Sequence, residues 1–69
     1  MSESKMNNRI LIARLFRGMK ISTLSNRTGI SVERIRDYEN GIKVPKQSDI
    51  INLAEALRIY PDFLIGGEK

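Results

Sequence analysis

Residues 21–41 decide the fold of this chain, and they read ISTLSNRTGISVERIRDYENG. On both sides of Gly29 the apolar residues recur at helical spacing, without the alternation that is typical of a strand. Gly29 can adopt the left-handed backbone that ends one helix and lets the next cross it steeply. Ser31 is a good N-cap, and Glu33 lies in the first turn, where the helix dipole favours an acid. The stretch predicts two short helices joined by a tight turn, the second over about 32–40.

Glycine and proline residues divide the rest of the chain into three more helical segments. Gly18 ends a segment over about 7–17, and a turn leads through Pro45 into another over about 47–57. Pro61 opens a last segment of one or two turns, a position that suits its fixed backbone. The clearest buried stripe, at i, i+3, i+4, i+7 spacing, consists of Ile50, Leu53, Ala54 and Leu57. Five short helices with short connections predict a compact all-α domain.

The 69 residues are enough for one small domain. We expect it to span 7–65, with a flexible N-terminal arm at 1–6 and a tail or the start of a linker at 66–69. The apolar run at 10–13 is cut by Arg14, so it is too short for a signal peptide or a membrane span. The sequence therefore predicts a cytoplasmic protein with no membrane partner.

The composition excludes several kinds of chemistry. The chain has no Cys and no His, which rules out disulfides and the usual zinc sites. The acids are scattered, and no glycine-rich phosphate loop is present, so no catalytic constellation can be assembled. We expect no enzyme activity, no metal and no cofactor.

The positive charge is concentrated in the first two thirds of the chain. Residues 5–46 hold ten Lys or Arg against three acids, a net +7, whereas residues 47–69 hold two against four, a net −2. With Glu3 the total is +4. This distribution favours an anionic partner for the first two thirds.

The arrangement of glycine, apolar and signature residues resembles the lambda-repressor-like (XRE-type) helix-turn-helix family over about residues 8–65. Its most specific part is YENGIKVP at 38–45, which is similar to the family's aromatic/aliphatic-Glu-x-Gly-x-x-x-Pro signature. The other matching positions are Gly18, Met19, Leu24, Ser25, Gly29, Ile30, Ser31, Ile35, Ile50, Leu53, Ala54, Leu57, Ile59 and Leu64. The resemblance implies a compact five-helix DNA-binding domain whose second and third helices form the helix-turn-helix.

The resemblance also implies a sequence-specific double-stranded DNA binder that regulates transcription. The helix over about 32–40 would enter the major groove as the recognition helix, with the second helix across the DNA backbone. We expect a prokaryotic repressor, associated with the nucleoid through DNA, that binds a palindromic operator as a homodimer. The chain departs from the family at Lys20-Ile21, where Thr-Gln is usual, and at Val32, where a polar residue such as Gln is common.

The recognition helix is expected to turn one face to the core and the opposite face to DNA. With Ile35, Tyr38 and Glu39 inside, the base-reading candidates are Val32, Glu33, Arg36 and Asp37. An arginine can bind guanine, an acid can accept from a cytosine amino group, and a valine can cover a thymine methyl group. The expected phosphate contacts are Arg9, Arg17, Lys20, Ser22, Arg27, Arg34, Asn40, Lys43 and Lys46.

Arg14 and Glu39 lie on stripes that otherwise face the core. The resemblance implies a buried ion pair between them, which would link the first helix to the third and position the recognition helix. The alternative is two separate solvated charges. The high cost of burying either charge alone favours the pair.

Phe63, Leu64 and Ile65 are three consecutive apolar residues at the end of the last helix. So short a helix cannot bury all three beneath itself. We expect either a lid on the core or a contact between the two copies of a dimer.

Two other functions remain open from the sequence. An antitoxin-like or adaptor module would use the same fold to bind a protein, and the acids Glu33 and Asp37 on the reading face favour it. A basic amphipathic membrane binder is suggested by residues 8–17. That helix would need a free apolar face, whereas the fold needs this face in the core.

Overall fold

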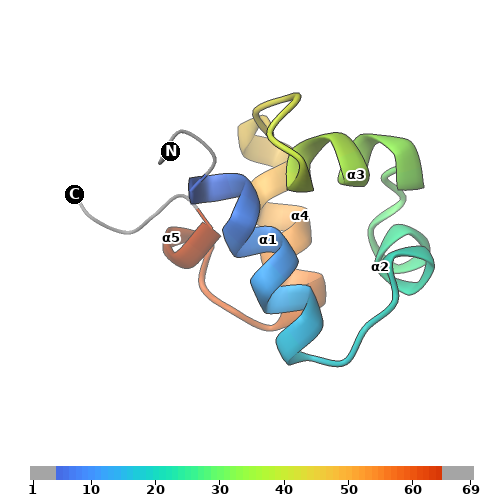
Figure 1. Ribbon diagram of the computed structural model, residues 1–69. Coiled ribbons are helices and arrows are strands. Elements are labelled where there is room, and N and C mark those ends of the chain that lie inside the picture. Colours follow the sequence, from blue (N-terminus) through green and yellow to red (C-terminus); the bar gives the residue numbers. More distant parts are fainter. Residues whose placement is uncertain (1–4, 65–69) are drawn as a thin grey trace.

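The computed structural model describes residues 5–64 of the chain, with side chains from Arg9 onward. Its helices are α1 (Lys5–Phe16), α2 (Ile21–Thr28), α3 (Val32–Glu39), α4 (Gln47–Leu57) and α5 (Pro61–Leu64) (Figure 1). No residue in this described range forms a strand. The prediction of a compact, five-helix, all-α domain is therefore confirmed.

α1 begins at Lys5, two residues earlier than the helical segment expected over about 7–17. The first four residues of the expected arm, the expected tail at 66–69 and Ile65 lie outside the described residues.

The turn between α2 and α3 is built as its sequence predicts. Gly29 has φ 77°, and its N–H donates to the Ser25 carbonyl at 2.8 Å, which closes α2. The Ser25 hydroxyl donates to the Ile30 carbonyl at 2.6 Å, while the Ile30 side chain is buried. The Ser31 hydroxyl then accepts from the Arg34 N–H at 3.0 Å and caps α3. These bonds fix the direction in which α3 leaves α2.

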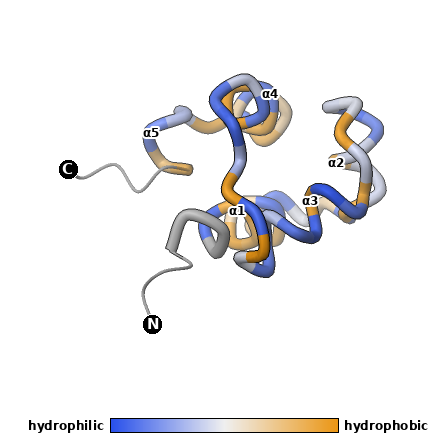
Figure 2. The backbone as a smooth tube through the Cα atoms, turned by 90° about the horizontal axis from the view of Figure 1, so that it is seen from above, coloured by the Kyte–Doolittle hydropathy of each residue, from blue (hydrophilic) through white to orange (hydrophobic). Residues whose placement is uncertain are grey.

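The helices are arranged with α1 and α4 in the middle, α5 at one end, and α2 with α3 at the other (Figures 1 and 2). α1 packs against α3, α4 and α5, and α2 packs against α3 and α4. α3 is therefore held from behind by α1 and α2, which leaves its opposite side open.

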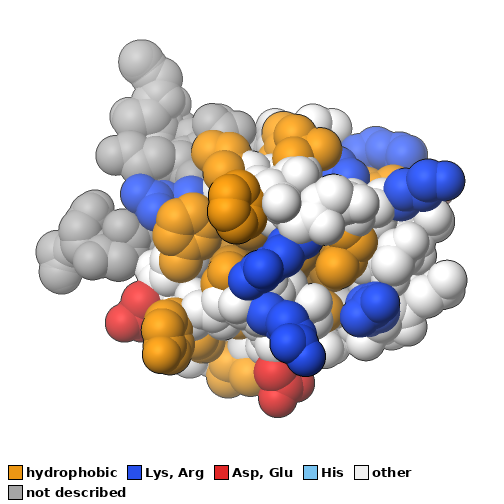
Figure 3. Space-filling model, turned by 90° about the horizontal axis from the view of Figure 1, so that it is seen from below, with side chains coloured by type: hydrophobic (Ala, Val, Ile, Leu, Met, Phe, Trp, Pro, Cys, Tyr) orange, Lys and Arg blue, Asp and Glu red, His pale blue; other side chains and the backbone are white. Residues whose placement is uncertain are grey.

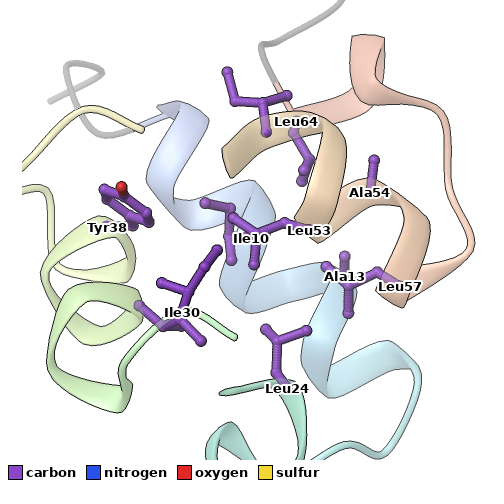
Figure 4. Packing of buried hydrophobic residues seen from close by; sticks show 11 residues of the cluster. Ile10, Ala13, Leu24, Ile30, Tyr38, Leu53, Ala54, Leu57 and Leu64 are labelled. Carbon is purple, nitrogen blue, oxygen red and sulfur yellow. The ribbon is translucent and has the colours of Figure 1, made fainter. Parts of the chain in front are cut away.

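One hydrophobic core joins all five helices (Figure 4). It consists of Ile10, Ala13, Leu24, Ile30, Ile35, Tyr38, Ile50, Leu53, Ala54, Leu57 and Leu64. Each fully buried aliphatic side chain contributes roughly 1.5–3 kcal/mol relative to its exposed state. The apolar stripe that the sequence predicts for α4 lies entirely within this core.

Candidate nucleic-acid interface

α3 has a buried face and an exposed face. The buried face is formed by Ile35, Tyr38 and Glu39. The opposite face carries the base-reading candidates: Glu33 and Arg36 are exposed, and Val32 and Asp37 are half-buried. Asn40 is the exposed C-cap residue at the end of this face. Glu33 and Arg36 are thus accessible on a helix that is anchored from behind, and Val32 and Asp37 are partly accessible.

An ion pair with two hydrogen bonds anchors the C-terminal end of α3 to α1. Arg14 Nε donates to Glu39 Oε2 at 2.7 Å and Nη2 donates to Oε1 at 3.0 Å. Nη1 of the same guanidinium donates to the Met19 carbonyl at 3.0 Å. Only 13% of the Arg14 side chain and 6% of the Glu39 side chain are exposed. The hydrogen bond and charge of Glu39 raise the pKa of Arg14, although burial acts in the opposite direction.

A second polar cluster connects α3 to the first turn of α4. Asp49 is 5% exposed, and its carboxylate accepts a hydrogen bond from the Tyr38 hydroxyl. Arg34 Nε lies 3.2 Å from Asp49 Oδ2, and Arg34 Nη2 donates to Oδ1 at 3.4 Å. Burial raises the pKa of Tyr38, and the hydrogen bond and charge of Asp49 act in the same direction. One carboxylate thus holds two side chains of α3.

Besides Arg34, two further arginines expected at DNA phosphates bind other groups in the described part of the molecule. Arg17 Nε donates to the Leu57 carbonyl at 2.7 Å and Nη2 to the Arg58 carbonyl at 2.9 Å, so its charge caps the C-terminus of α4. Arg9 Nη1 donates to the Phe63 carbonyl at 3.3 Å, and its guanidinium lies 4.9 Å from the centre of the Phe63 ring. Both cations thus bind other helices of this chain.

The remaining phosphate candidates surround the helix-turn-helix. They are Lys20, Ser22, Arg27, Asn40, Lys43 and Lys46, and all are exposed. Lys20 occupies the N-cap position of α2 without a side-chain hydrogen bond to the helix. A shallow depression beside it is lined by Arg17, Lys20, Thr23 and Arg27. The free N–H groups at the start of α2 and these cations provide a local positive field.

Part of the positive charge of residues 5–46 is engaged in contacts within the molecule. Among the described side chains of this segment, Arg9, Arg14, Arg17 and Arg34 bind other groups of the chain. The side chains of Lys20, Arg27, Arg36, Lys43 and Lys46 are exposed. Viewed from below, several basic side chains lie on the same face as hydrophobic side chains (Figure 3).

The last helix is divided between the core and the surface. Leu64 has an exposed fraction of 0%, so it is a lid on the core and has no surface to offer a second copy. Phe63 is 38% exposed. It borders an apolar groove that Ile12 and Phe16 of α1 also line. Of the two described residues expected at a dimer contact, only Phe63 is accessible.

These features define a helical domain in which a short helix, α3, has one exposed face. Its other face is held by the core and by two ion pairs, and exposed cations lie on the neighbouring segments. The family model described as helix-turn-helix (HTH_3, XRE-type) matches residues 10–64. The chain belongs to this family of DNA-binding regulators. Comparisons with curated proteins and with solved structures give no match. Within residues 5–64, no helix is both long and apolar enough to cross a bilayer.

Sequence reasoning missed Asp49 and the internal partners of Arg17 and Arg34. Asp49 had a detectable signal, because it precedes Leu53 by four and Leu57 by eight positions and so lies on their buried stripe. An acid on such a stripe requires a partner. The carbonyl groups that bind Arg17 had no comparable signal, since backbone groups at a helix end look alike in every sequence.

Proposed function

We propose that this protein is a sequence-specific double-stranded DNA-binding transcriptional regulator of a prokaryote, and that it acts as a repressor. The observation that carries the proposal is the exposed face of α3, which is clamped from behind through Glu39 and Asp49. A rigid helix that projects polar side chains is what major-groove recognition requires.

Each side chain of the reading face has a definite chemical preference. Arg36 would donate to O6 and N7 of guanine. Glu33 or Asp37 would accept from the amino group of cytosine, and Val32 would contact a thymine methyl group. An acid beside the DNA backbone is repelled by the phosphates. Only a base pair that offers a hydrogen-bond donor compensates this repulsion, so the acid selects against all other base pairs.

The cations around this face would hold the DNA backbone. Lys20, Arg27, Lys43 and Lys46 are exposed on the segments that flank α3. Ser22 and the N–H groups at the start of α2 would add neutral donors next to Lys20-Ile21, the position where the family has Thr-Gln. These contacts would set the register of α3 without reading sequence.

We also propose that two copies bind a palindromic operator. Half-sites on one face of the duplex would lie about 34 Å apart, one helical turn. Bound across a promoter, such a dimer would repress by occlusion, and the protein would reside in the cytoplasm, on the nucleoid.

Selection of binding sites from random duplex DNA is the decisive experiment. The expected result is one enriched, palindromic sequence, with binding that weakens steeply as salt increases. Arg36→Ala should relax the preference at one position of each half-site. Its matched control, Lys46→Ala, should weaken all sequences alike. Equal, weak binding to every duplex would refute the proposal.

The acids Glu33 and Asp37 support a second candidate, an antitoxin-like or adaptor module that binds a protein through α3. Glu33 is exposed and Asp37 is half-buried, so both are available to a basic partner. For this candidate, Glu33→Gln would weaken the protein complex and would strengthen rather than reduce residual DNA binding.

A further inference from the structure

Arg34 and Asp49 form a charged contact between α3 and α4, and neither residue is among the DNA contacts proposed above. α3 packs against α1 and α2, so Asp49 provides a separate connection to the first turn of α4. The carboxylate is 5% exposed and binds the Tyr38 hydroxyl as well as the Arg34 guanidinium. Arg14 holds the other end of α3 through Glu39.

The two partners of this contact differ in accessibility. The side chain of Asp49 is 7% exposed, whereas that of Arg34 is 39% exposed. Arg34 Nε is buried and, among the described groups, has no aligned hydrogen-bond acceptor. The contact is therefore held by charge more than by hydrogen-bond geometry. Neutralising Asp49 would free Arg34 to turn outward, because a guanidinium without a carboxylate is better solvated by water.

We infer that Asp49 is a positioning residue for DNA recognition, which keeps Arg34 off the DNA phosphates and fixes α3 against α4. The inference rests on the proposed DNA binding. Its consequence is that Arg34 adds little to non-specific affinity, although it lies in the first turn of the recognition helix. A binder that withholds one cation from phosphates loses non-specific affinity and gains in the ratio of specific to non-specific binding.

The test is the salt dependence of binding to a duplex of random sequence. Each phosphate contact adds about 0.9 to the slope of log K against log[salt]. Asp49→Asn keeps the volume of the side chain and an acceptor for Tyr38, and it should steepen the slope by about 0.9. A fourfold rise in salt would then weaken this variant about 3.5-fold more than the parent. The double variant Arg34→Gln/Asp49→Asn should return to the parental slope.

Two controls separate this result from a general effect of charge. Glu55→Gln removes an exposed acid from the same helix without freeing an arginine, so it should leave the slope near the parental value. In the parent background, Arg34→Gln should also leave the slope unchanged, whereas Lys46→Gln should reduce it by about 0.9. A reduced slope in Arg34→Gln, or an unchanged slope in folded Asp49→Asn, would overturn the inference.

Failure of the proposed function gives a different pattern. If the unmodified protein shows no salt-dependent binding to DNA, the proposed function is refuted. The release of Arg34 from Asp49 can then still be measured by NMR, without DNA. The Nε–Hε signal of Arg34 should be protected from water exchange in the parent and lose this protection in Asp49→Asn. Identical protection in both proteins would refute the role of Asp49 independently of DNA.

Discussion

Removal of the Glu39 carboxylate should be among the most damaging single changes in this protein. Breaking a buried ion pair costs about 3–5 kcal/mol, because the remaining charge stays without a partner. In Glu39→Ala, Arg14 would keep its hydrogen bond to the Met19 carbonyl and its side chain is 13% exposed, so we expect the lower end of this range, about 3 kcal/mol. A chain of this size has a total stability of roughly 3–10 kcal/mol.

Urea and thermal denaturation followed by circular dichroism would measure this loss. For a domain of 60–100 residues, about 3 kcal/mol corresponds to a decrease in Tm of roughly 12–24 °C. The matched control is Glu33→Ala, which removes an exposed acid from the same helix and should change stability by less than about 0.5 kcal/mol. Arg14→Met/Glu39→Leu should recover most of the loss, because an apolar pair needs no charge partner. A Glu39→Ala protein as stable as Glu33→Ala would refute the reasoning.

Three further predictions concern the turn, a helix cap and a tyrosine. Gly29→Ala should cost about 1–2 kcal/mol in chemical denaturation, purely from its φ of 77°, since no other group lies within 4 Å of an added Cβ; Gly29→Asn should cost less, and equal losses would contradict this explanation. Arg17→Gln should lower stability by about 1 kcal/mol by exposing two carbonyl groups of α4, while Lys20→Gln should have no measurable effect on thermal unfolding. The raised pKa of Tyr38 means that its neutral form stabilises the fold at pH values below the ordinary tyrosine pKa of about 10, and that this contribution is lost as pH rises through the higher folded pKa. Phenolate absorbance in a Tyr60→Phe protein would report Tyr38 alone, and a midpoint at or below the ordinary value would contradict its burial against Asp49.

Much of the site was predictable because it depends on local rules. The inward stripe of α3 follows from helical spacing, and the exposed positions of Glu33 and Arg36 follow from it by elimination. The partnership of Arg14 with Glu39 came only from the family resemblance, since 25 residues separate the two in sequence. Asp49 escaped notice because its role depends on where α4 meets α3.

By itself, the sequence determined the helices, the left-handed turn at Gly29 and the apolar stripes, since each depends on backbone preference or on spacing within a few residues. The tertiary structure decided which charged side chains a ligand can contact directly and which are held by other groups of the chain. Arg17 binds carbonyl groups 40 and 41 residues away, which fixes its side chain against α4, and Arg34 binds a carboxylate 15 residues away, which offsets its charge. The physical reason is that a charge interacts with whatever lies within a few ångströms of it. Helix packing sets that neighbourhood, whatever the order of residues along the chain.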